Sequence, residues 1–108
     1  MIDRLNIDSD ALNFFREALR QRLGPNLLRM LLFGSRARGD ADEQSDYDLL
    51  IIVKSVGETV DRAIDETAGQ ALLDYGAVFS AFPVAERTLQ RRKFSPFLVN
   101  AQNEAILL

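Results

Sequence analysis

The chain has 108 residues, with 13 lysine and arginine residues against 16 aspartate and glutamate residues, and its net charge is −3. It contains no cysteine and no histidine, which excludes disulfides, thiolate chemistry, the common zinc sites and every histidine-based acid–base mechanism. This length predicts a single domain spanning residues 1–108, and a hydrophobic content of 47% is typical of a globular protein. The chemistry left open is that of carboxylates, hydroxyls, arginines, backbone amides and bound metal ions.

The sequence also indicates in which cellular compartment the protein lies and what it binds. The start of the chain, Met1-Ile2-Asp3-Arg4, lacks the apolar stretch of a signal peptide, and the longest apolar run, residues 49–53, is too short to span a bilayer. We therefore expect a cytoplasmic protein that does not bind membranes. The mildly acidic charge argues against direct nucleic-acid binding, which usually needs a basic surface.

A helix is predicted from about residue 10 to residue 23. Asp8-Ser9-Asp10 supplies a capping side chain and negative charge for its first turn, and apolar residues recur within it at helical spacing. Gly24-Pro25 ends the helix, as glycine followed by proline commonly does. Residues 27–33 then form a short apolar run between turn residues, which predicts a buried strand.

The middle of the chain alternates between polar and apolar segments. Residues 34–45 are polar and predict a turn or short helix followed by a loop, whereas residues 48–53 predict a central strand buried on both faces. A helix is expected over residues 57–74 and a third strand over residues 77–84. Pro83 indicates that this third strand ends there or lies at the edge of the sheet.

Two shorter helices are expected after the third strand, over residues 86–92 and 95–104, the second beginning with a Ser-Pro pair. The apolar tail, residues 106–108, is expected to pair as a short edge strand, either within the domain or across a homo-oligomer. Strands that alternate with helices in this way predict a small α/β domain.

One stretch carries residues suited to chemistry, because a Gly-Ser pair ends the first strand and an Asp-x-Asp pair begins the second. Gly34 and Ser35 would let backbone amides approach an anion such as a phosphate. Asp46 and Asp48 are two residues apart as they enter a strand, so their side chains point to the same face. Neighbouring carboxylates of this kind suit Mg²⁺ that is shared with substrate phosphates. The stretch therefore predicts a nucleotide-handling site.

The segment from Gly34 to Asp48 resembles the signature of the DNA polymerase β-like nucleotidyltransferase superfamily, in which Gly-Ser, ten further residues and Asp-x-Asp follow one another. The fuller string, Gly-Ser-Arg-Ala-Arg-Gly and then Ser-Asp-Tyr-Asp-Leu, is similar to the minimal nucleotidyltransferase (MNT) branch. The resemblance implies the polymerase β-like core, an α/β (α+β) fold in which helices flank a small mixed β-sheet. It also implies that Gly34 and Ser35 hold the β,γ-phosphates of ATP or another NTP.

The same resemblance assigns roles to the charged residues of the segment. Asp46 and Asp48 are implied to be the catalytic residues, which ligate two Mg²⁺ ions and align the α-phosphate with an incoming hydroxyl. Arg36 and Arg38 lie in the Gly-Ser turn and are expected to bind the nucleotide by neutralising phosphate charge, with a structural role as the alternative for Arg38. Tyr47 points to the opposite face from its two aspartate neighbours, so we expect it to pack in the core.

Proteins of the MNT branch are often encoded beside a HEPN-domain partner as toxin–antitoxin pairs, and some transfer AMP from ATP to a tyrosine of the toxin. The resemblance therefore implies a Mg²⁺-dependent nucleotidyltransferase that moves a nucleoside monophosphate, AMP from ATP, to a hydroxyl of a HEPN-type toxin. The alternative is an antitoxin subunit with weak or no activity, which neutralises its partner by direct binding.

One part of the family pattern is missing. Polymerase β-like enzymes usually take a third carboxylate from a later strand beside the Asp-x-Asp strand, but residues 77–84 contain no acid, and Ser80 is the only polar side chain among them. Asp74 and Glu86 flank this strand, and either would need a shift of register or loop to reach the metal ions. The missing acid favours the binding alternative, whereas the intact Gly-Ser and Asp-x-Asp pairs favour the enzyme.

Overall fold

The computed structural model describes residues 9–39, 46–91, 96, 103 and 105–108. In chain order the elements are α1 (Asp10–Leu23), the 3-10 turn η2 (Gly24–Asn26), β1 (Leu27–Phe33), α2 (Ser35–Arg38), β2 (Tyr47–Val53), α3 (Glu58–Tyr75), β3 (Phe79–Ala85), α4 (Glu86–Arg91) and β4 (Ile106–Leu107). Each of these α-helices and strands lies within a few residues of its predicted range, and the 3-10 turn at Gly24–Asn26 was not predicted. The helix expected over residues 95–104 lies, for most of its length, outside the described residues.

Helix α1 begins and ends where its cap residues predict. The Ser9 hydroxyl accepts a hydrogen bond of 3.0 Å from the Leu12 backbone N–H, and the Gly24 N–H donates to the Arg20 carbonyl at the other end. The side chains of Leu12, Phe15 and Leu19 on one face are fully buried. Burial of a side chain of this size stabilises the fold by roughly 1.5–3 kcal/mol relative to exposure, so this face holds α1 against the sheet.

The sheet has four strands in the order β3-β2-β1-β4 and is mixed. Strand β2 is antiparallel to β1 and parallel to β3, and β4 is antiparallel to β1. Six of the seven residues of β2 are buried, which confirms the prediction of a central strand. Pro83 lies in β3 at the edge of the sheet, where its missing N–H costs no ladder hydrogen bond. The apolar tail pairs with β1 of the same chain, which is the first of the two arrangements expected for it.

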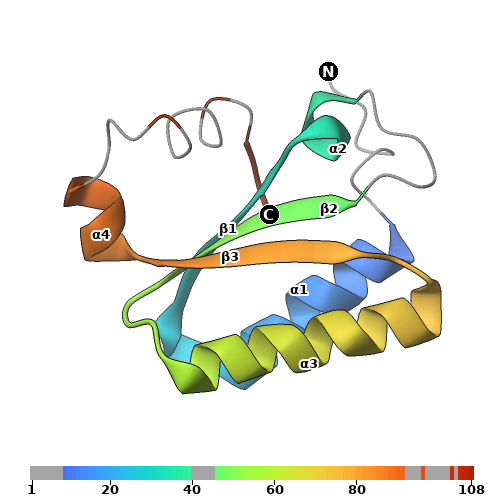
Figure 1. The fold of residues 1–108 in the computed structure, drawn as a ribbon, viewed down its shortest axis with the longest axis horizontal. Coiled ribbons are helices and arrows are strands. Elements are labelled where there is room, and N and C mark those ends of the chain that lie inside the picture. The colour runs from blue at the N-terminus through green and yellow to red at the C-terminus, as the bar shows by residue number, and fades with distance from the viewer. Residues whose placement is uncertain (1–8, 40–45, 92–95, 97–102, 104) are drawn as a thin grey trace.

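Helices α1 and α3 lie side by side on one face of the sheet (Figure 1). Alternate residues of β2, from Tyr47 to Val53, point towards these helices and form the larger core. On the opposite face Leu50 and Ile52 pack with Leu89 of α4 in a smaller cluster. The fold is the predicted one, a mixed sheet flanked by helices. No helix among the described residues combines the length and the apolar character that crossing a bilayer requires.

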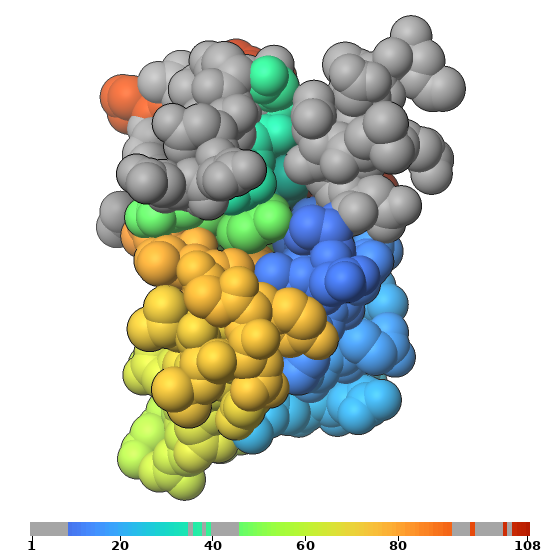
Figure 2. Space-filling model, turned by 90° about the vertical axis from the view of Figure 1, so that its right-hand side faces the viewer, coloured from blue at the N-terminus to red at the C-terminus, as the bar shows by residue number. Residues whose placement is uncertain are grey.

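The topology brings three chain segments to one end of the sheet. Because β1 and β2 are antiparallel, the end of β1 at Phe33 lies beside the start of β2 at Asp48. Because β2 and β3 are parallel, the start of β3 lies there as well, with Ser80 beside Asp48. Figure 2 views the molecule from this side, where the start of β2 (green) reaches the surface between α2 (teal) and the connection from α3 to β3 (orange).

Candidate active site

The Gly-Ser turn leaves β1 through a backbone conformation that favours glycine. Gly34 has φ +78°, in the left-handed region, and its carbonyl accepts a hydrogen bond of 3.1 Å from the Ala37 N–H as α2 begins. Helix α2 is a single short turn from Ser35 to Arg38. The side chains of Ser35 and Arg38 lie outside the described part of the structure, so their nucleotide-binding roles stay predictions.

The two aspartates lie at the start of β2, as predicted. Asp46 is exposed immediately before the strand, and Asp48 is half-buried as its second residue. The Tyr47 side chain between them is 4% exposed and belongs to the larger core. Since successive side chains of a strand point to opposite faces, Asp46 and Asp48 both point away from α1 and α3. The prediction that Tyr47 packs in the core is confirmed.

Gly34 and Asp48 are in close contact. A Cβ atom added at Gly34 would overlap the Oδ2 atom of Asp48, and it would crowd the rest of that side chain as well. Glycine therefore has two reasons to occupy this position, its positive φ and the space that the carboxylate takes. The structure thus brings the Gly-Ser turn and the Asp-x-Asp pair together, although 13 positions separate Gly34 from Asp48 in the chain (48 − 34 − 1 = 13).

Arg36 is an arginine of the turn whose side chain the structure describes. Its guanidinium carbon lies 4.0 Å from the centroid of the Tyr47 ring. This ring is on the face of β2 opposite the Asp48 side chain. Binding of a nucleotide phosphate by Arg36 stays a prediction, and its contact with Tyr47 is a feature that the sequence did not predict.

The comparisons with known proteins agree with this arrangement. The sequence model of the nucleotidyltransferase domain matches residues 12–101, which is most of the chain. The chain belongs to the nucleotidyltransferase domain family. This confirms the resemblance drawn from the Gly-Ser and Asp-x-Asp motifs.

Two curated relatives come from Methanocaldococcus jannaschii. "Putative protein adenylyltransferase MJ1305" is 32% identical over 93 residues, a match that covers 83% of this chain and 63% of the relative. The protein of the same description numbered MJ0604 is 31% identical over 101 residues, covering 94% of this chain and 97% of the relative. The chain thus spans somewhat less than two thirds of the first relative's length and nearly all of the second's.

A solved structure described as the crystal structure of a toxin–antitoxin with AMP-PNP is similar in fold. Its TM-score is 0.56 with 21% sequence identity, and the match covers 69% of this chain and 57% of that chain. At this identity the likeness concerns the fold alone. Together with the family match, it confirms the predicted fold, a mixed sheet flanked by helices.

The nucleotidyltransferase family implies divalent metal ions, and the donor set at the start of β2 fits them. Asp46 and Asp48 offer carboxylate oxygens on one face, at the surface, and hard oxygen donors are the ligands that Mg²⁺ prefers. The absence of a side chain at Gly34 leaves room for the Asp48 carboxylate. Within the described residues no group of three or more acidic side chains gathers as a complete metal cage. A pair of carboxylates suits an ion that takes its remaining ligands from phosphates and water.

Neither flanking acid is the register partner of Asp48 on the sheet. Asp74 lies on α3, which packs on the other face of the sheet, and it accepts a hydrogen bond of 2.8 Å from Gln70. Glu86 forms an ion pair with Arg29 at N···O 2.7 Å. It follows the end of β3, beyond the level of Val53. Val53 is five positions beyond Asp48, which is roughly 17 Å along a strand.

The face of β3 that continues the aspartate face carries no acid. Ser80 is the register partner of Asp48, and Val78, just before β3, lies beside the start of β2, where its carbonyl accepts a hydrogen bond of 2.9 Å from the Tyr47 N–H. Phe82, the next residue on this face, is apolar. Ser80 therefore occupies the position nearest to Asp48 on β3, where an acid would complete a set of three carboxylates.

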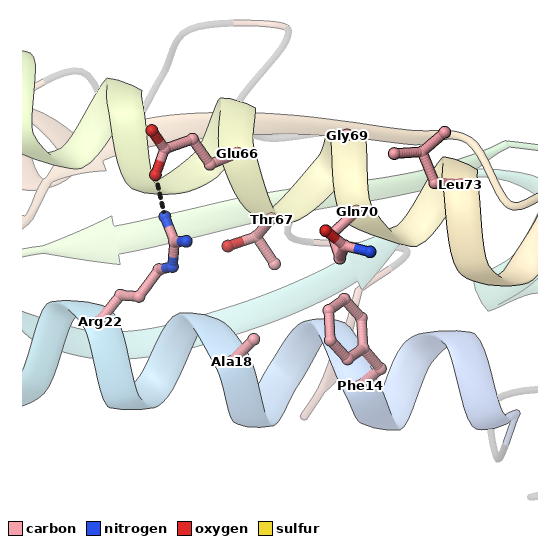
Figure 3. Close-up of a pocket in the computed structure, with 8 residues that line it drawn as sticks. All are labelled: Phe14, Ala18, Arg22, Glu66, Thr67, Gly69, Gln70 and Leu73. Carbon is pink, nitrogen blue, oxygen red and sulfur yellow. Dashed lines mark hydrogen bonds and ion pairs between the residues drawn. The ribbon is translucent and has the colours of Figure 1, made fainter.

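A groove of about 610 Å³ lies between α1 and α3 and is separate from the candidate site. Figure 3 shows the side chains of Phe14 and Leu73 at one end of it, and the ion pair of Arg22 with Glu66, N···O 2.5 Å, at the other. The groove is on the helix-covered face of the sheet, whereas Asp48 points to the opposite face. We assign it no part in the chemistry of the aspartates.

Proposed function

We propose that the protein is a Mg²⁺-dependent nucleotidyltransferase that transfers AMP from ATP to a hydroxyl group of a partner protein. The family assignment and the adenylyltransferase names of the two relatives support transfer of AMP to protein. The structural neighbour, a toxin–antitoxin with AMP-PNP, supports ATP as the nucleotide and a toxin as the partner. We propose a HEPN-type toxin in this role, and the cytoplasm, where ATP is plentiful, as the compartment.

The contact between Gly34 and Asp48 carries this proposal. Transfer of a nucleoside monophosphate needs a phosphate-binding turn and metal-binding carboxylates that are close enough to contact the same nucleotide. The antiparallel pairing of β1 with β2 brings the turn and the aspartates into direct contact. We propose that Gly34, Ser35 and Arg38 hold the terminal phosphates, and that Asp46 and Asp48 hold the metal ions.

The proposed reaction is a displacement at the α-phosphorus of ATP. The acceptor hydroxyl oxygen forms the new bond to phosphorus, the bond to the bridging oxygen breaks, pyrophosphate leaves, and the hydroxyl proton passes to solvent. Asp46 and Asp48 would hold Mg²⁺, which would supply neutralisation of the phosphate charge and favour in-line displacement. The chain's own contribution is to fix the aspartates at the start of β2 and the turn beside them, which lowers the entropic cost of alignment.

A specific observation favours a second candidate function. The residues beside the aspartates are Val78, just before β3, and Ser80 and Phe82 of β3, so no carboxylate there is available as a general base for the acceptor hydroxyl. The second candidate is an antitoxin subunit that binds nucleotide and neutralises its partner by contact. In this case transfer would be slow or absent while the complex with the toxin is tight.

The two functions are separated by an assay with the protein encoded beside this one in the genome. The pair is incubated with ATP labelled at the α-phosphate and with Mg²⁺, and label on the partner protein is measured. We expect label on the partner with the unaltered chain and its loss, by at least a factor on the order of 100, in Asp46→Asn and Asp48→Asn. Each change removes a metal ligand while keeping the size of the side chain.

Asp65→Asn is the matched control, because Asp65 is an exposed carboxylate on α3, away from the start of β2. We expect this variant to label the partner as the unaltered chain does. A tight complex of the two proteins without any labelled product would exclude the enzyme and leave the binding function. Equal labelling by the Asp46, Asp48 and Asp65 variants would show that the proposed site is wrong.

A further inference from the structure

Four side chains stack behind the aspartate pair, on the helix-covered face of the sheet. The guanidinium carbon of Arg36 lies 4.0 Å from the ring centroid of Tyr47. The Tyr47 ring stacks on Phe79 with centroids 4.7 Å apart, and Phe79 stacks on Phe15 at 4.3 Å. We call these four residues the aromatic column. It joins α2, β2, β3 and α1, which are the elements around the candidate site.

Tyr47 is held from several directions within this column. Its backbone N–H donates to the Val78 carbonyl at 2.9 Å, and its hydroxyl and the Ser9 hydroxyl are hydrogen-bonded at 2.8 Å. Arg36 follows β1 and Phe79 lies in β3, so the two contacts reach the ring from opposite sides of β2. The backbone of Tyr47 is consequently fixed, and so are the directions of Asp46 and Asp48 on either side of it.

Arg36 is two residues beyond Gly34, and it lies between the Gly-Ser turn and the Asp-x-Asp pair. Its contact with Tyr47 links the Gly-Ser turn to the aspartate pair on the rear face of β2, while Gly34 touches Asp48 on the front face. The Gly-Ser turn and the aspartate pair are thus connected by two contacts, one on each face of β2. For its guanidinium to reach a phosphate held at the aspartates, Arg36 would have to leave the Tyr47 ring.

We infer that Arg36 is a positioning residue, which acts through the Tyr47 ring to hold the Gly-Ser turn and the two aspartates in one arrangement. It does not bind a phosphate of the nucleotide directly. This inference rests on the proposed function, because a metal–nucleotide complex is what the arrangement would serve. It changes the predicted role of Arg36, and it leaves Arg38 as the arginine of the turn that is predicted to bind the nucleotide.

The test is a double-mutant cycle on nucleotide binding. Arg36→Met, Tyr47→Leu and the double variant are titrated with α,β-methylene-ATP, which cannot transfer AMP, at a fixed Mg²⁺ concentration in a calorimeter. If Arg36 acts through Tyr47, each single change weakens binding about fivefold and the double change is only slightly weaker than either. If Arg36 binds a phosphate, the losses multiply to about 25-fold, which overturns the inference.

A second measurement separates positioning of the carboxylates from a general loss of structure. The Mg²⁺ concentration that gives half-maximal nucleotide binding is compared between Arg36→Met and the unaltered chain, together with nucleotide affinity in EDTA. We expect the Mg²⁺ requirement to rise about fivefold and the metal-free affinity to stay unchanged. A loss of similar size in EDTA would mean a direct phosphate contact. This comparison needs no Tyr47 variant, so it decides the question even if Tyr47→Leu does not fold.

Arg62→Met serves as the matched control, because Arg62 is an exposed arginine of α3 that forms an ion pair with Glu58 four residues away. We expect its nucleotide affinity and Mg²⁺ requirement to equal those of the unaltered chain. Failure of the proposed function and failure of this inference give different results. Absence of nucleotide binding by the unaltered chain overturns the proposed function together with this inference, whereas multiplied losses in a chain that binds nucleotide overturn this inference alone.

Discussion

The Asp48 carboxylate occupies the space that a side chain at Gly34 would need. We therefore predict that Gly34→Ala is damaging for two reasons. The new Cβ would displace Asp48, and alanine at a positive φ would add about 1–3 kcal/mol of backbone strain. Transfer to the partner protein should fall on the order of 10- to 100-fold, because a shift of about 1 Å in an aligned group costs this much. Labelling with α-labelled ATP measures the loss.

Gly69 provides the control for this change. It lies within α3, it is exposed, and an added Cβ would meet no atom within 4 Å. Gly69→Ala should therefore leave transfer unchanged and raise the free energy of unfolding by about 0.5–1 kcal/mol, since alanine favours a helix over glycine. Equal activity of the Gly34 and Gly69 variants would contradict the role given to the contact with Asp48.

The two acids that flank β3 are predicted to be dispensable for metal binding. Glu86 is paired with Arg29, and Asp74 accepts a hydrogen bond from Gln70 on α3, which packs on the face of the sheet opposite the Asp48 side chain. Titration with Mn²⁺ as a probe metal should give the same affinity for Glu86→Gln, Asp74→Asn and the unaltered chain. A tenfold loss in either variant would show that this acid reaches the metal ions.

The ion pair between Arg29 and Glu86 should instead contribute modestly to stability. The two side chains are 41% and 27% exposed, so solvent screens their attraction. We predict that Glu86→Gln lowers the free energy of unfolding in urea by about 0.5–1 kcal/mol at low salt, and by less at 1 M salt. A loss that does not depend on salt would point to packing of the glutamate instead.

The elements of this fold were predictable because their signals are local. Ser9 and Gly24 determine the ends of α1 through hydrogen bonds within a few residues of each cap. The apolar residues of β2 indicate a central strand whatever its neighbours are. The Asp-x-Asp spacing alone places both carboxylates on one face of a strand. Helical periodicity, by contrast, places Leu72 in the buried stripe of α3, but it is 53% exposed because it lies at the margin of that stripe beside Ala71.

The contacts that assemble the site depend on register and could not be derived from the sequence. The alignment of Ser80 beside Asp48 follows from the parallel pairing of β2 with β3, and a shift of one residue would have exposed the opposite face of β3. The contact of Arg36 with Tyr47 similarly needs the turn after β1 to lie over the start of β2. The only local sign of this contact in the sequence is the tyrosine between the two aspartates.

Ser9 is predicted to stabilise the fold beyond an ordinary helix cap. Its hydroxyl accepts from the Leu12 N–H and is also hydrogen-bonded to the Tyr47 hydroxyl. Ser9→Ala should lower the free energy of unfolding by about 1–2 kcal/mol, the upper part of the range for losing a cap. Urea denaturation measures this change. Ser55→Ala, at an exposed position, should stay within about 0.5 kcal/mol of the unaltered chain.

Ser80→Asp should complete the set of carboxylates, because Ser80 lies beside Asp48 on the aspartate face. Three acids without a metal repel one another, so we expect this variant to melt at a lower temperature than the unaltered chain in EDTA. A divalent ion that binds only the folded state stabilises it. Mg²⁺ should therefore raise the melting temperature of Ser80→Asp by more than it raises that of the unaltered chain. Ser80→Asn has nearly the same size without the charge and should show neither effect. If Mg²⁺ stabilises the aspartate and asparagine variants equally, Ser80 does not face the metal position.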